Sequence, residues 1–218
     1  MAEAYFTYLA PALMLAALFI VVVRRGRWWV RVPVFYRATA TVAVALCSVM
    51  PFCSGLSAAS LLLSISPSFS IGTVAVMLLF IVRNITKDRS NGTRAQGRVL
   101  DRATLGLFCL WNVIVGTALY SGTLGLLPHD LYFVGYTFSW VFILTAALTL
   151  VAIVTGSRLK WVFLAYVVAW NHALLPSPNF FDYIIDPVLF FISIGVLVSY
   201  ARYSMKGCEK VAEGADLL

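Results

Sequence analysis

Histidine and aspartate side chains can bind metal ions or exchange protons, and this 218-residue chain carries them at a few places between long apolar stretches. His129 and Asp130 adjoin each other in LLPHDLY, and His172 ends a later apolar stretch. Asp182 and Asp186 lie in NFFDYIIDP. Because an ionisable side chain is costly inside a bilayer, these five residues form the candidate functional group.

Their residue types and spacing predict a site for a cation or a proton. Imidazole and carboxylate groups can bind zinc together, but the sequence contains no H-E-x-x-H or similar helical spacing. The sequence therefore predicts no metal site, and it leaves catalytic residues unknown. No cofactor is expected either, since the last apolar stretch has no lysine for a retinal Schiff base and the two histidines do not sit at the matched depth that haem requires.

Two interpretations of the aspartates remain open. A spacing of four would place Asp182 and Asp186 on one helical face, where mutual repulsion would suit proton exchange. Alternatively, Pro187 favours the first position of a helix, which would make Asp186 its N-cap, facing the positive end of the helix dipole. His172 has a similar alternative as a neutral imidazole that hydrogen-bonds a neighbouring helix.

The composition indicates what must position these residues. Hydrophobic residues make up 61% of the chain and charged residues only 11%, and the mean hydropathy is +0.92. Soluble domains contain roughly a quarter of charged residues. The chain is therefore predicted to be an all-α integral membrane protein.

The basic residues predict how the chain crosses the membrane. All sixteen Lys and Arg fall in four stretches, 24–37, 83–102, 158–160 and 202–210, and the connections between these stretches have none. Basic loops stay on the cytoplasmic side. This alternation predicts seven transmembrane helices, with the N-terminus outside and the C-terminus cytoplasmic.

The apolar stretches give the approximate bounds of the helices, within a single transmembrane domain of residues 1–203. Residues 55–68 are apolar but too short to cross, so we expect a re-entrant or interfacial segment there. Residues 204–218 are expected to form a cytoplasmic tail. The predicted spans are about 5–23, 38–52, 69–82, 103–120, 135–154, 159–174 and 186–203.

Charge divides unequally between the two predicted sides. The inner segments hold sixteen bases against five acids, a balance of +11, whereas the outer segments hold Glu3, Asp130, Asp182 and Asp186 without a base, a balance of −4. The basic loops should face anionic lipid headgroups. Nucleic acid is not expected as a partner, because no aromatic or glycine-rich binding pattern accompanies the arginines.

These features predict a membrane protein with many apolar spans and few residues that could catalyse a reaction. We expect a non-enzymatic transporter-like bundle, or an accessory subunit that binds other membrane proteins within a complex. The alternative is a membrane-embedded, metal-assisted hydrolase that acts on a lipid or lipid-linked substrate at the outer leaflet. Short connections and the lack of an organelle signal favour a bacterial inner membrane.

Overall fold

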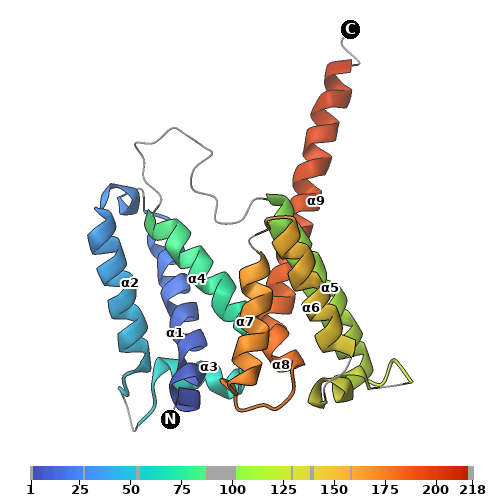
Figure 1. Cartoon of the computed structure of the whole chain (residues 1–218). Coiled ribbons are helices and arrows are strands. Elements are labelled where there is room, and N and C mark those ends of the chain that lie inside the picture. The colour runs from blue at the N-terminus through green and yellow to red at the C-terminus, as the bar shows by residue number, and fades with distance from the viewer. Residues whose placement is uncertain are drawn as a thin grey trace.

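The computed structural model of this chain describes residues 2–26, 28–52, 55–86, 102–128, 130–137, 140–157 and 159–215, and within them all side chains except those of 2–5, 30, 102 and 204–215. The chain is all-helical, with 78% of it in helices and no strand in these ranges. The elements are α1 (Ala2–Val23), η1 (Trp29–Arg31), α2 (Val34–Val49), α3 (Ala58–Ile65), α4 (Ile71–Thr86), α5 (Arg102–Thr123), η2 (Leu131–Tyr136), α6 (Trp140–Val154), α7 (Leu159–Asn171), α8 (Phe181–Ile184) and α9 (Pro187–Ala215) (Figure 1).

The long helices run up and down, so the connections gather at two ends (Figure 1). One end, here called the acidic end, carries the N-terminus, α3, η2 and α8. The opposite end, here called the basic end, carries η1, the last turn of α4 and the first turn of α7. Arg24 joins two helices there, since its Nη1 donates to Asn84 Oδ1 at 2.7 Å.

Two packed groups of helices make up the fold, and α4 joins them. In the N-terminal group, α1 packs on α2 and α4 around a small core that includes Ala16, Ala17 and Ile20. In the C-terminal group, α5 packs on α9, and α6 packs on α7, around a larger core rich in aromatic rings such as Phe163 and Tyr166. Because α4 also contacts α7, α8 and α9, its N-terminus reaches the junction of the two groups.

Within the described residues, two helices are long and apolar enough to cross a membrane, namely α1 over Phe6–Val23 and α5 over Ala103–Thr123. The other predicted spans also contain helices, but their apolar parts are shorter, at 10–17 residues. The sequence thus predicted where helices form, while length alone supports membrane crossing for only two of them.

The helix bounds differ from the predicted ones at most ends, and three of these differences have a clear cause or consequence. α2 begins at Val34, directly after Pro33, because proline fits the start of a helix. The helix predicted from residue 135 begins only at Trp140, since residues 131–136 form the separate 3-10 helix η2. α9 continues past Tyr203 to Ala215, through residues predicted to form a tail.

Residues 55–68 contain α3, which lies across the acidic end (Figure 1). Its start follows from a local signal: Ser57 Oγ accepts from the Ser60 amide, and Ser60 Oγ accepts from the Ser57 amide. This reciprocal pair is a capping box, which satisfies two amides that a helix end leaves free.

Many large apolar side chains lie on the surface, and several polar side chains lie in the otherwise apolar interior. Large apolar side chains such as Leu18, Phe35 and Val154 are exposed, whereas Thr73 and Asn112 are fully buried. Such broad apolar exposure is unusual for a monomeric soluble protein. Several helices therefore present apolar faces that water would not favour.

Candidate functional site

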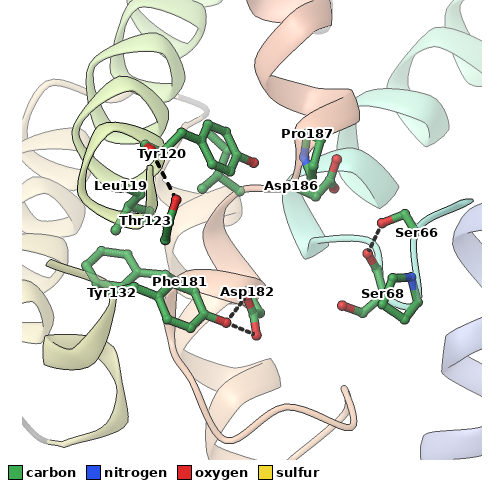
Figure 2. Close-up of a pocket in the computed structure, with 12 residues that line it drawn as sticks. Ser66, Ser68, Leu119, Tyr120, Thr123, Tyr132, Phe181, Asp182, Asp186 and Pro187 are labelled. Atoms are coloured by element: carbon green, nitrogen blue, oxygen red, sulfur yellow. Dashed lines mark hydrogen bonds between the residues drawn. The ribbon is translucent and has the colours of Figure 1, made fainter. Parts of the chain in front are cut away.

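A cavity of about 260 Å³ opens at the acidic end, where the loop after α3 faces α5, η2 and the α8–α9 junction (Figure 2). Among the described residues that line it are two carboxylates and two phenols, but no lysine or arginine. The lining residues are Ser66, Pro67, Ser68, Leu119, Tyr120, Thr123, Tyr132, Phe181, Asp182, Ile185, Asp186 and Pro187. Two of the predicted candidates, Asp182 and Asp186, therefore share one cavity.

Asp186 is buried and hydrogen-bonded on both carboxylate oxygens. Its Oδ2 accepts from the Ser70 amide at 2.7 Å and from Thr73 Oγ1 at 2.5 Å. Its Oδ1 accepts from the Leu189 amide at 2.9 Å. These three donors belong to the first turns of α4 and α9, so one carboxylate joins two helix N-termini.

The start of α4 explains why a carboxylate fits there. Ser70 caps this helix, because its Oγ accepts from the Thr73 amide at 3.2 Å and its carbonyl accepts from the Val74 amide at 3.2 Å. The first amides of a helix have no intrahelical acceptor, and the helix dipole makes this end positive. Asp186 supplies the missing acceptor for the Ser70 amide together with a negative charge.

The prediction that Asp186 caps the last helix is confirmed by its bond to the Leu189 amide. The prediction that Asp182 and Asp186 share one helical face is wrong. α8 ends at Ile184, and Ile185 is extended at φ −142° and ψ 146°. Pro187 disfavours helical backbone at the residue before it, so the chain breaks between the two aspartates and each approaches the cavity from a different element.

Asp182 is only partly buried and has a single partner in the described part of the chain. Tyr132 Oη lies 2.7 Å from each of its carboxylate oxygens and donates to them. A carboxylate has about four lone-pair sites. Asp182 therefore keeps most of its capacity to accept hydrogen bonds or bind a cation (Figure 2).

Tyr132 remains a donor because its environment favours the neutral phenol. Burial raises the pKa of Tyr132, and the hydrogen bond to Asp182 and the negative charge of that carboxylate raise the pKa further. Its ring also stacks on Phe181, with ring centroids 6.5 Å apart. The phenol thus stays protonated beyond the usual tyrosine range.

A second set of contacts positions Tyr132 against α8. Asn179 Nδ2 donates to the Tyr132 carbonyl at 2.8 Å, and Asn179 Oδ1 accepts from the Phe181 amide at 2.9 Å. Gly135 makes this close approach possible, since a Cβ there would lie 2.0 Å from Asn179 Oδ1. A side chain at residue 135 would push η2 away from α8.

Sequence reasoning missed the partners that distinguish the two carboxylates. Tyr120 and Tyr132 resembled residues of a membrane-interface belt, and Asn179 carried no motif. Ser70 and Thr73 had a usable signal, because a serine followed three residues later by a hydroxyl residue is compatible with a helix N-cap. No local pattern, however, could pair them with Asp186.

The other predicted residues do not line this cavity. Asp130 is exposed and caps η2, since its Oδ1 accepts from the Tyr132 amide at 3.0 Å. His172 is exposed in the turn that follows α7. His129 and the Glu3 side chain lie outside the described residues.

The cavity combines negative charge with aromatic and hydroxyl groups. Within the described ranges, no three His, Cys, Asp or Glu side chains group closely enough to hold a metal ion. Comparisons of the chain with known protein families, with curated proteins and with solved structures give no match. The chemistry of this cavity must therefore be inferred from its own residues.

Proposed function

We propose that this chain is a multi-pass protein of the cell membrane, with seven helices across the bilayer, the N-terminus outside and the C-terminus in the cytoplasm. The exposed apolar faces of its helices support this proposal, because they suit hydrocarbon better than water. The segregation of basic residues to one end supports the orientation. Short connections favour a bacterial inner membrane.

The short helices are compatible with this arrangement. α7 has 13 residues, which at 1.5 Å per residue is roughly 20 Å, less than the roughly 30 Å hydrocarbon core. Non-helical backbone is tolerated at membrane depth where it is packed against protein. We infer that α3, η2 and α8 occupy the outer part of the bilayer and complete the depth that the short helices leave.

Within this topology, we propose that the cavity binds a small cation from the outer side, as the binding site of a transporter-like bundle. One observation carries the proposal: Asp182 lines the cavity with most of its acceptor capacity unused. No basic side chain among the described residues lines the cavity to neutralise it. Asp186 adds negative charge at the same cavity while it holds α4 and α9 together.

A cation-binding role is preferred here to metal-assisted hydrolysis. Hydrolytic zinc sites usually use three protein ligands and keep one open position. The two carboxylates of the cavity come with phenols and serine hydroxyls, and such oxygen groups suit a hard cation better than zinc. They can equally accept hydrogen bonds from a protonated amine. An accessory subunit would need the same residues only for packing, and this difference can be tested.

The test compares cation-dependent stability of the purified protein in detergent. Asp182→Asn removes the charge but keeps an oxygen that can accept from Tyr132. Sodium chloride or ethylammonium chloride replaces N-methylglucamine chloride at constant ionic strength, and the Tm is followed. A cation at 100 times its Kd adds about 2.7 kcal/mol to the free energy of unfolding, so the wild-type Tm should rise and that of Asp182→Asn should not.

Asp130→Asn is the matched control, because Asp130 is an exposed aspartate at the same end that does not line the cavity. Its cation response should equal that of the wild type. The same response in Asp182→Asn and the wild type would contradict the proposal. A wild-type Tm that does not respond to the cations would instead favour the accessory subunit, which needs these residues only for packing.

A further inference from the structure

Another cavity lies in a different part of the molecule, toward the basic end. Its volume is about 730 Å³, and it opens between α5, α6 and the first turns of α7. Phe108, Ala152 and Phe163 form a buried floor, whereas Leu107 and Val151 are exposed at its two sides. The cavity is therefore a groove with an apolar floor, open on the surface of the bundle.

This groove continues toward the acidic end. A second cavity of about 170 Å³ lies between the outer halves of α5 and α6, has a wholly apolar lining and shares Trp111 with the first. Space remains between α5 and α6 because each packs on other elements: α5 packs on α9 and η2, whereas α6 packs on α7. Two apolar cavities that meet at Trp111 thus lie along much of the length of α5.

The end of the groove at the basic end is polar and positive. Thr155, Gly156 and Ser157 form its rim and lead directly into α7, whose Leu159 amide donates to Ser157 Oγ at 3.3 Å. Ser157 thus caps the start of α7, and the partial positive charge of a helix N-terminus favours an anion. Lys160 follows the lining residue Leu159 in the first turn of this helix and adds a full positive charge there, with its Nζ 5.9 Å from the centroid of the Trp161 ring.

The shape of the groove favours a chain of methylenes over a protein helix. A helix about 10 Å in diameter would fill 730 Å³ in fewer than two turns. Helix contacts in membranes also favour small residues, whereas this lining is mostly bulky, with Leu107, Phe108 and Trp111 on α5. An acyl chain occupies one leaflet, which is about half of the roughly 30 Å hydrocarbon core. It therefore fits a groove that follows only part of a helix.

We propose that this groove binds an anionic phospholipid of the inner leaflet, with an acyl chain along α5 and the phosphate at the Thr155–Ser157 rim beside Lys160. The Ser157 hydroxyl can donate a hydrogen bond to the phosphate, the positive end of the α7 dipole favours its charge, and Lys160 provides the charge that distinguishes an anionic headgroup from a zwitterionic one. Basic pockets between membrane helices on the cytoplasmic side bind such headgroups. The inference rests on the proposed membrane orientation and is independent of the cation cavity.

Native mass spectrometry of the full chain tests the inference. The detergent-purified protein is mixed with equal amounts of dioleoyl phosphatidylglycerol and dioleoyl phosphatidylcholine, and the retained lipid is counted. The wild type should retain one phosphatidylglycerol. Lys160→Gln should lower the preference for phosphatidylglycerol about fivefold, the effect of one base near an anionic headgroup.

Two variants block the groove from its exposed sides and leave the core intact. Val151→Trp and Leu107→Trp should each abolish lipid retention, whereas Val168→Trp, an exposed position on α7 that does not line the groove, should retain it. The proposal is overturned if both groove variants retain phosphatidylglycerol as the wild type does, or if the wild type retains the two lipids equally. It is also overturned if the groove variants lose a bound protein or a second copy of the chain while they keep the lipid.

Discussion

The cavity at the acidic end has two walls, and each carries one carboxylate in a different setting. On the α4–α9 wall, Asp186 is buried and accepts from three donors that belong to two helix N-termini. On the α8–η2 wall, Asp182 is partly exposed and accepts from one phenol. Residues of the same type, four positions apart, thus have different surroundings.

This difference separates a structural role from a binding role. The donors around Asp186 offset the cost of burying its charge and fix the junction of the two helix groups. Asp182 has fewer protein partners, so a ligand can compete for it at little cost to the fold. Substitutions on the two walls should therefore have different effects on stability and on cation binding.

Asp186→Ala should destabilise the protein most. The substitution leaves buried amide and hydroxyl donors without an acceptor, and we expect a loss of about 3 kcal/mol in the free energy of unfolding. Asp182→Ala should cost about 1 kcal/mol, since it removes one hydrogen bond at a partly exposed site. Thermal unfolding in detergent measures both, and equal losses would remove the distinction between the walls.

Gly72→Ala should be the next most damaging change. A Cβ at Gly72 would lie 2.5 Å from Leu189 Cδ2 and 2.9 Å from the Ile184 carbonyl oxygen, so α4 and α9 must separate. Overpacking of this kind costs about 2 kcal/mol. Gly195→Ala is the control, because nothing lies within 4 Å of its Cβ; a helical alanine there should stabilise by up to about 1 kcal/mol.

A pair of hydroxyl deletions compares the two walls directly. Thr73→Val removes a donor to buried Asp186 and should cost about 2 kcal/mol, whereas Tyr132→Phe removes the donor to Asp182 and should cost about 1 kcal/mol. Tyr132→Phe keeps the ring that stacks on Phe181. Tyr132→Phe should affect the cation-dependent rise in Tm more than it affects stability itself. Thr73→Val should leave the cation-dependent rise in Tm unchanged.

The smallest expected effect is a dependence on alkaline pH that belongs to Tyr132. Its pKa is raised in the folded protein, so the unfolded chain releases this proton first and stability falls as the pH rises above the ordinary tyrosine pKa of about 10. The difference in Tm between the wild type and Tyr132→Phe should therefore shrink between pH 9 and pH 11. A difference that is constant over this range would contradict the raised pKa.

Much of the fold could be predicted from the sequence because its signals are local. Apolar stretches mark helices in each expected span, and the Asp186-Pro187 pair starts α9. The break before α9 is also local in cause, although the spacing of four between the aspartates suggested one continuous helix. Proline chemistry outweighs that spacing.

The identity of the site residues could be predicted only in part. Asp182 and Asp186 were candidates because bases are lacking around them, but the same argument selected Asp130 and His172, which the fold places outside the cavity. Tyr132 was missed, because an aromatic residue near a span end has an ordinary explanation at the membrane interface. The apolar groove along α5 had no sequence signal, since lipid-facing and groove-facing leucines are alike.

By itself, the sequence determined where helices form and which end of the bundle is basic, because turn residues, caps and charge act over a few positions. The tertiary structure decided which polar groups meet. The Ser70 amide and Asp186 are 116 residues apart, and Tyr132 and Asp182 are 50 apart. Such contacts depend on how whole helices pack, and the packing turned one of two similar carboxylates into a link between helices and left the other open to a ligand.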